Sequence, residues 1–206
     1  MQIIEKYFPN ITLKQRNQFL HLEKQYIYWN NRINVISRKS IHNFYTHHIL
    51  HSLSISKLIK LKANTSILDV GTGGGFPGIP LAILFPEVNF ILVDSIGKKI
   101  KVVKDIIKKS KLSNVQAINT RAEHIEEKFD FIISRAVTNM TDFRKIIKGK
   151  IKDDNKNLMN NGIFYLKGGD LSEELRNISY EEYNISDYFQ EDFFKTKKII
   201  YVPNIS

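Results

Sequence analysis

Cysteine is absent from the 206 residues of this chain. Its absence excludes a disulfide framework, a cysteine-ligated zinc site and any reaction that needs a thiolate nucleophile. The chain also lacks a run of about 18 apolar residues, the length that a membrane-spanning helix requires. Its first residues, MQIIEKYFPNITL, lack the basic and then apolar layout of a signal peptide. We therefore expect a cytoplasmic protein that contacts no membrane.

The composition is that of a folded protein with a basic surface. Hydrophobic residues make up 42% and charged residues 25% of the chain, and 31 Lys and Arg against 21 Asp and Glu give a net charge of +10. Such a charge favours a polyanion as partner, most often a nucleic acid. It can also reflect codon usage, because Lys, Ile and Asn are abundant together. The lysines within residues 98–111 likewise suit either an RNA backbone or an ordinary solvated helix face.

The apolar residues divide the chain into a helical part and an alternating part. Residues 12–60 contain no glycine and place apolar side chains at spacings near three and four, which predicts helices. Residues 65–167 alternate short β-rich runs with helical runs, which indicates right-handed βαβ units and a parallel sheet covered on both faces. Strands are expected at 66–70, 88–93, 115–119, 129–134 and 162–166, and helices at 78–85, 98–111 and 141–151.

The last part of the chain changes character again. Residues 181–189 and 196–202 are predicted to form two strands joined by a short polar turn, with Pro203 ending the second strand. The expected fold is therefore α/β, a Rossmann-like, mostly parallel sheet with an antiparallel C-terminal hairpin and an N-terminal helical cap. We place the cap at residues 1–62 and the sheet domain at residues 63–206, the two forming one compact unit.

A glycine-rich segment from Asp69 to Gly78 lies between the first strand and the first helix of the sheet. Ligands of open α/β sheets bind at this edge, and Gly71 and Gly73 let the backbone approach them closely. A phosphate-binding loop would need Gly-Lys-Ser/Thr, which is missing, and a dinucleotide fingerprint would need a third glycine where Phe76 stands. The spacing Asp-x-Gly-x-Gly-x-Gly is typical of sites for S-adenosylmethionine, a cofactor without phosphate. It predicts the class I methyltransferase fold.

Two acidic residues follow at the ends of the next strands. Asp94 ends the second strand, where a carboxylate can accept hydrogen bonds from both ribose hydroxyls of the cofactor; a helix N-cap is the alternative. Glu123 follows the third strand in the segment Thr120-Arg121-Ala122-Glu123. We expect it either to flank the adenine ring or to be an ordinary loop acid.

The segment after the fourth strand narrows the choice of methyl acceptor. Transfer to cytosine C5 is excluded, since it needs a cysteine thiolate. Transfer to an exocyclic amine commonly uses Asn/Asp-Pro-Pro-Tyr at the position where this chain has Ser134-Arg135-Ala136-Val137. Guanine N7 presents a lone pair and no proton, so positioning can supply most of the rate without a general base. Other acceptors of this kind stay open.

Two arginines, Arg121 and Arg135, come just after strands on the expected ligand edge. We expect them to bind phosphate oxygens, guanine O6 or the cofactor carboxylate. The alternative is a surface arginine paired with Glu123 or Asp94.

Histidines and aromatic residues of the N-terminal part are weaker candidates. His47 and His51 have the i, i+4 spacing of a zinc pair, but the glutamate of His-Glu-x-x-His is missing, so we expect no metal. The aromatic residues Tyr26, Tyr28 and Trp29 could stack on bases, but at helical spacing such residues are more often part of a core.

Five segments of the chain together resemble a known family. They are DVGTGGGFPGIPLAI, DSIGKK, NVQAINTRAEHI, FDFIISRAV and LKGG, and the upstream WNNRINVI and HHILHSL are similar to that family's N-terminal helices. The family is the small-subunit ribosomal RNA methyltransferase G family, also called glucose-inhibited division protein B, and the resemblance covers roughly residues 20–170. It implies methyl transfer from S-adenosyl-L-methionine to N7 of guanine 527, in the 530 loop of 16S rRNA of the small ribosomal subunit.

The resemblance and the glycine pattern together imply which residues form the site. Cofactor contacts are expected from Gly71, Gly73, Phe76, Asp94, Ser95, Ile96, Ala122, Glu123 and Arg135, and the basic residues facing the reaction are Arg121, Arg135 and Lys167. Two positions depart from the family pattern. His51 replaces the aspartate of His-Ile-Leu-Asp-Ser, and Ile36 replaces the threonine of Asn-Leu-Thr, which affects substrate positioning. The alternatives are a methyltransferase for another substrate and a non-catalytic ribosome-assembly factor; a monomer satisfies every observation.

Overall fold

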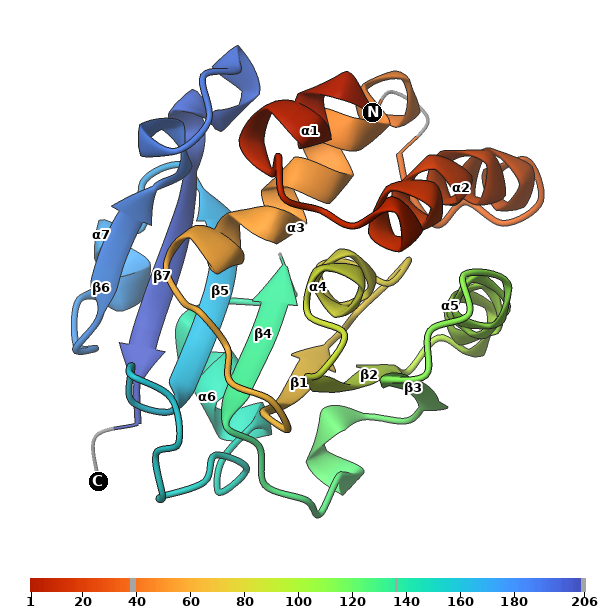
Figure 1. Ribbon diagram of the computed structural model, residues 1–206. Helices are drawn as coiled ribbons and strands as arrows, with labels where there is room; N and C mark the ends of the chain where they lie inside the picture. The colour runs from red at the N-terminus through yellow and green to blue at the C-terminus, as the bar shows by residue number, and fades with distance from the viewer. Residues whose placement is uncertain (38–39, 136, 205–206) are drawn as a thin grey trace.

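Seven strands form one sheet in the order β3-β2-β1-β4-β5-β7-β6 (Figure 1). The computed structural model describes residues 1–37, 40–135 and 137–204, so Ala136 of the segment after the fourth strand lies outside the described residues. Strands β1 to β5 are parallel, and β7 is antiparallel to both of its neighbours, which confirms the predicted sheet. The strands are β1 Ser66–Val70, β2 Asn89–Asp94, β3 Val115–Asn119, β4 Phe131–Arg135, β5 Gly162–Gly168, β6 Glu181–Asn184 and β7 Lys197–Pro203.

Both faces of the sheet are buried, because successive side chains of a strand point to opposite sides. Ile67 of β1 belongs to one hydrophobic cluster and the next residue, Leu68, belongs to the other. Helices α4 and α5 cover the first face, and α6 and α7 cover the second (Figure 1). The bounds are α4 Gly78–Leu84, α5 Gly97–Lys109, α6 Met140–Ile146 and α7 Ser172–Leu175. Because β1 to β5 run parallel, their carboxyl ends lie at one edge of the sheet, and the loops that follow them can form a site there.

The N-terminal cap adds helices on the side of α4 and α5 (Figure 1). Helix α2 (Leu13–Asn30) begins after Thr12, whose side chain forms a capping box with Gln15. The short helix α1 (Gln2–Tyr7) lies outside the predicted helical stretch. Buried Tyr26 and other cap residues share one hydrophobic cluster with α4 and the sheet. The boundary at residue 62 stays a prediction.

The helices predicted within residues 12–60 include a continuous helical run from residue 41 to residue 57. Its middle is a π-helical turn (Tyr45–Leu50) followed directly by α3 (His51–Leu53). π-helical turns inside helices are frequent at functional sites. Here the turn carries His47 and His48, and α3 carries His51, toward the edge of the sheet where the strands end.

Two predicted elements are wrong in their extent. The strand predicted at 181–189 ends at Asn184, because Ile185 and Phe189 are both buried at a spacing of four, which suits a helical turn. The two C-terminal strands are thus joined by 3-10 turns, and the predicted short polar turn is wrong. The helix predicted at 141–151 ends at Ile146, ahead of Gly149, whose φ is +75°.

No helix among the described residues combines the length and the hydropathy of a membrane span.

Candidate functional site

The loop after β1 folds back through glycines in the left-handed region. Gly71 and Gly73 have φ of +64° and +59°, which other residues rarely adopt. A Cβ at Gly71 would lie 2.5 Å from Cγ2 of Val137, so a side chain there would also collide with the segment after β4. The amide of Thr72 donates to the carbonyl of Val93 at 3.0 Å, which ties the loop to the end of β2. The loop therefore offers bare backbone at the ligand edge of the sheet.

The side chain of Asp69 connects the two ends of the glycine loop. Its Oδ2 accepts hydrogen bonds from Oγ1 of Thr72 at 2.6 Å and from the amide of Gly78 at 2.9 Å. The carboxyl group is fully buried, and burial raises the pKa of Asp69 to about 7. Its Oδ1 has no hydrogen-bond partner among the described residues. A buried acceptor left without a partner suits a site that a ligand or an ordered water completes.

Asp94 ends β2 directly opposite the loop. Its Oδ2 accepts a hydrogen bond from the amide of Gly73 at 2.9 Å, and its Oδ1 accepts one from the amide of Ile96 at 2.8 Å. The second bond closes a turn ahead of α5, whose N-cap residue is Ile96 and which has no side-chain cap, so the N-cap alternative for Asp94 is wrong. The carboxylate thus connects the glycine loop with the start of α5 and lies at the cavity described next.

A cavity of about 530 Å³, here called the loop cavity, lies between the glycine loop and the turn after β3. The structure brings all of the predicted cofactor residues to this one place. They are Gly71, Gly73, Phe76, Asp94, Ser95, Ile96, Ala122, Glu123 and Arg135, and the predicted Arg121 lines the same cavity. These residues come from the four segments that follow β1, β2, β3 and β4, and they meet there because the ends of these strands lie at the same edge of the sheet.

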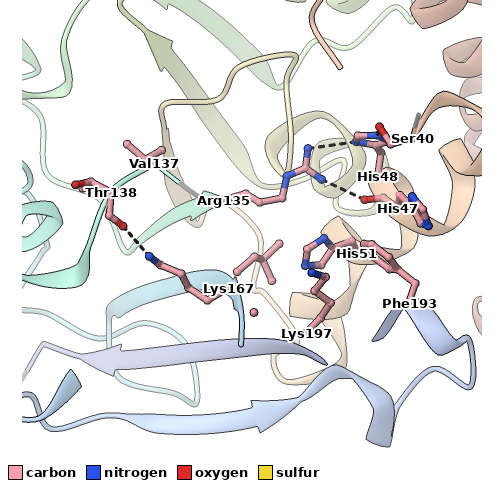
Figure 2. Close-up of a pocket in the computed structure, with 12 residues that line it drawn as sticks. Ser40, His47, His48, His51, Arg135, Val137, Thr138, Lys167, Phe193 and Lys197 are labelled. Atoms are coloured by element: carbon pink, nitrogen blue, oxygen red, sulfur yellow. Dashed lines mark hydrogen bonds between the residues drawn. The ribbon is translucent and has the colours of Figure 1, made fainter. Parts of the chain in front are cut away.

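A second cavity of about 550 Å³, here called the histidine cavity, adjoins the first (Figure 2). Its walls come from the helical run of the cap, from the ends of β4 and β5, and from the start of β7. Ser40, His47, His48, His51, Arg135, Val137, Thr138, Leu166, Lys167, Gly168, Phe193 and Lys197 line it. Arg135 and Val137 line both cavities, so the two spaces meet at these two residues.

Arg135 is held at this junction by the cap. Its guanidinium donates to the carbonyl of His47 at 3.4 Å and to Nδ1 of His48 at 3.3 Å, and lies 5.0 Å from the ring centre of Phe76 (Figure 2). Burial lowers the pKa of Arg135 to about 10, which leaves it charged at neutral pH. The alternative pairing with Glu123 or Asp94 is absent from the ion pairs of the described residues.

The hydrogen bonds of His48 define its protonation. Nδ1 must accept, because the arginine only donates, so the proton lies on Nε2, which is 2.9 Å from Oγ of Ser40. Oγ of Ser40 in turn donates to the carbonyl of Ser37 at 2.8 Å. Burial and the nearby Arg135 lower the pKa of His48 to about 3, in agreement with a neutral ring. A neutral imidazole therefore fixes the guanidinium.

The predicted basic residue Lys167 lies in the histidine cavity but its charge is engaged. Its Nζ donates to the carbonyl of Thr138 at 2.7 Å and pairs with Glu174 at 3.0 Å. Tyr165 also holds Thr138, since its hydroxyl accepts from the amide of Thr138 at 2.9 Å. Lys167 thus lines the cavity, as expected, while its charge holds the segment after β4 in place, and a role in the reaction stays a prediction.

Two residues of the cap reach the glycine loop although the sequence did not single them out for it. The hydroxyl of Tyr26 donates to the carbonyl of Gly74 at 2.5 Å, and Val35 lines the loop cavity. Oδ1 of Asn30 accepts from the amides of Val35 and Ile36 at 3.0 and 3.1 Å, which shapes this segment. The spacing predicted Tyr26 as a core residue, which its burial confirms, but no local pattern reveals a contact 48 residues away.

Comparison with known sequences gives a consistent result. A family model described as rRNA small subunit methyltransferase G matches residues 15–199. A relative from Flavobacterium psychrophilum, named Ribosomal RNA small subunit methyltransferase G, is 58% identical over 204 residues, which cover 98% of each chain. A relative of the same name from Porphyromonas gingivalis is 52% identical and covers 98% of this chain and 93% of its own.

Solved structures share the fold at low identity. A SAM-dependent methyltransferase from Aquifex aeolicus superposes with a TM-score of 0.58 at 15% identity, covering 81% of this chain and 98% of that one. A precorrin-6y C5,15-methyltransferase from Geobacter metallireducens gives a TM-score of 0.56 at 13% identity, covering 84% and 92%. This likeness concerns the fold and confirms the predicted class I methyltransferase architecture.

Proposed function

The chain belongs to the rRNA small subunit methyltransferase G family, and on this basis we propose that it methylates N7 of guanine 527 in 16S rRNA. The chain is a methyltransferase, its methyl donor is S-adenosylmethionine, and its substrate is RNA of the small ribosomal subunit. We propose the target base and the target atom. We also propose that the chain acts on the small subunit as a cytoplasmic monomer. The observation that carries the proposal is the meeting of two cavities at Arg135 and Val137.

The loop cavity suits the methyl donor. Gly71 and Gly73 leave room for a ligand against the backbone, and Asp94 offers carboxylate oxygens at the second strand end, where a ribose is bound in folds of this kind. When bound, S-adenosylmethionine supplies an electrophilic methyl group on a positively charged sulfur. Ala122 and Glu123 line the same cavity and would flank the adenine.

The histidine cavity suits the target guanine. Arg135 and Val137 line both cavities, so a base in the histidine cavity and a methyl donor in the loop cavity would meet beside these two residues. The guanidinium of Arg135 favours the acceptor-rich edge of guanine, which carries O6 beside N7. Donation to O6 leaves the lone pair of N7 free for the methyl group. The same arginine disfavours adenine, which presents an amino group at the corresponding position.

The chemistry requires positioning and no general base. Among the residues that line the histidine cavity there is no carboxylate, and burial lowers the pKa of all three lining histidines, His47, His48 and His51, so each is a weak base. Such a site cannot readily remove a proton from an amine or a hydroxyl. N7 has no proton to lose, so a held base and a held donor are sufficient. This match between the site and the acceptor supports N7 over acceptors that must be deprotonated.

The test is to map the methylated base in RNA treated with the purified chain. Small ribosomal subunits and naked 16S rRNA from cells that lack the modification are incubated with labelled S-adenosylmethionine. The Arg135→Ala chain is the matched control for contaminating activity. We expect label on N7 of guanine 527, with a preference for the assembled particle. Label on another base or atom contradicts the assignment, and cofactor binding without transfer to either RNA favours a non-catalytic assembly factor.

A further inference from the structure

His51 forms part of the wall of the histidine cavity and has an unused ring nitrogen. The side chain is buried, and its Nε2 has no hydrogen-bond partner among the described residues. Two aromatic rings hold the imidazole edge to face, Phe193 at 5.6 Å and Phe194 at 6.3 Å between centres. Figure 2 shows the ring between Arg135 and Lys197. A buried polar atom that is left without a partner calls for a specific explanation, since native proteins rarely retain one.

Several other acceptors of the cavity are engaged. Both nitrogens of His48 make hydrogen bonds, to Arg135 and to Ser40. The ring of His47 lies flat on that of Phe193, with centres 4.0 Å apart. The carbonyl of His47 accepts from Arg135, and that of Thr138 accepts from Tyr165 and Lys167.

The donors of the cavity are plentiful, and its residues include no carboxylate. Guanine also presents donors, since its Watson–Crick edge carries N1–H and the N2 amino group. Those donors would lose their water in a cavity lined mainly by cations and apolar groups, at a cost in free energy unless an acceptor takes them. His51 can be such an acceptor only if its ring is neutral. Burial, together with the nearby Arg135 and Lys197, holds the pKa of His51 well below its usual value, so the ring is neutral at neutral pH, and the tautomer with its proton on Nδ1 offers the lone pair of Nε2.

We propose that Nε2 of His51 accepts a hydrogen bond from an N–H group on the Watson–Crick edge of the target guanine and thereby selects this base. The inference rests on the proposed function, because it requires the base to occupy the histidine cavity. Arg135 and His51 would then recognise opposite edges of one base, Arg135 as donor and His51 as acceptor. Adenine fails both tests, since it offers an amino group to the arginine and a lone pair at N1 to the imidazole. His51 is in this sense a specificity residue and takes no part in methyl transfer itself.

The test compares two substitutions of His51 on three substrates. His51→Leu removes the acceptor, and His51→Gln returns an amide oxygen near the position of Nε2. The substrates are reconstituted small subunits that carry guanine, inosine or 1-methylguanine at the target position; inosine lacks the N2 amino group and 1-methylguanine lacks N1–H. On guanine, we expect His51→Leu to lower kcat/KM roughly 10- to 100-fold and His51→Gln to recover a large part of it.

The pattern across substrates decides the matter. The loss caused by His51→Leu should shrink to within about 3-fold on whichever analogue lacks the contacted N–H, since that bond is already missing there. An equal loss on all three substrates overturns the proposal and makes His51 a packing residue. So does a kcat/KM on guanine within about 2-fold of the unchanged chain.

Two controls separate this proposal from the proposed function. His42→Leu changes an exposed histidine of the same helical run outside both cavities and should leave all rates unchanged. The affinity of His51→Leu for S-adenosylmethionine should also be unchanged, because His51 does not line the loop cavity. If the unchanged chain fails to methylate the target guanine, the proposed function fails. If it methylates guanine and His51→Leu keeps the full preference for it, only the His51 inference fails.

Discussion

Removal of one oxygen atom from Tyr26 tests whether the cap shapes the cofactor site. Tyr26→Phe deletes only the hydroxyl that donates to the carbonyl of Gly74. It keeps the buried ring, whose centre lies 4.8 Å from the ring centre of Phe76 and 5.2 Å from that of Phe44. The residue is fully buried, so water cannot readily replace the lost donor. A buried acceptor left without its partner costs about 1–3 kcal/mol.

That free energy falls on a loop whose conformation depends on glycines in the left-handed region. Gly71, Gly73 and Gly75 all have positive φ, and the hydroxyl of Tyr26 is the contact that fixes the carbonyl between the last two of them. Once the loop is free to adopt other conformations, binding has to restore the competent one, which raises the apparent dissociation constant. We expect the Kd for S-adenosylmethionine to rise about 3- to 10-fold. The melting temperature should fall by about 2–4 °C for each kcal/mol lost.

The two effects are measured by calorimetric titration with S-adenosylmethionine and by thermal unfolding without it. Tyr28→Phe is the matched control, because it makes the same chemical change on the same helix at an exposed side chain. A lower melting temperature with a Kd within about 2-fold of the unchanged chain would refute the reasoning. The bond would then stabilise the cap and leave the loop unaffected.

Three further predictions concern the site itself. Asp94→Ala should weaken binding of S-adenosylmethionine by about 10-fold or more in the same titration; near-normal affinity would show that the ribose assignment is wrong. Arg135→Ala should lower kcat/KM for small subunits about 100-fold while the circular dichroism stays native; unfolding with retained specific activity would make Arg135 structural. Burial raises the pKa of Asp69 from 3.8 to about 7, so the folded chain holds a proton that the unfolded chain releases, and stability falls as pH rises between these values. Asp69→Asn should therefore lessen the loss of stability, about 1.4 kcal/mol per pH unit, in urea unfolding between pH 5 and 7; an unchanged slope would contradict the assigned pKa.

The sequence was sufficient for those parts of the fold that depend on local periodicity. Strands such as β1 were predictable because a short β-rich run is bounded by turn residues, and the glycine loop because its spacing is its own signal. The end of β6 was not, since Ile185 and Phe189 suit both an alternating strand and a helical turn until their burial is known. Tertiary context decided between the two.

The sequence predicted which residues line the two cavities better than it predicted what each of them contacts. A strand end places Arg135 at the ligand edge, but only the folded chain shows that the cap residue His48 fixes it. Lys167 illustrates the opposite case. The family resemblance suggested a basic residue that faces the active site, whereas the structure also pairs that charge with Glu174, seven residues further on. A single sequence does not show which side chains of separate elements pair. Whether a charged side chain is already paired is therefore what sequence reasoning predicts least well.

The distribution of charge between the two cavities also bears on turnover. Before transfer, guanine presents the electron-rich O6 and N7 edge, which the cationic Arg135 attracts. Methylation at N7 moves one positive charge from the loop cavity into the histidine cavity, where Arg135 and Lys197 are already cationic and no lining carboxylate offsets them. The same side chains therefore stabilise the bound substrate and destabilise the bound product. On the proposed assignment, a cavity lined without a carboxylate has two consequences. The neutral imidazole of His51 is left to accept from the base, and the methylated base leaves faster.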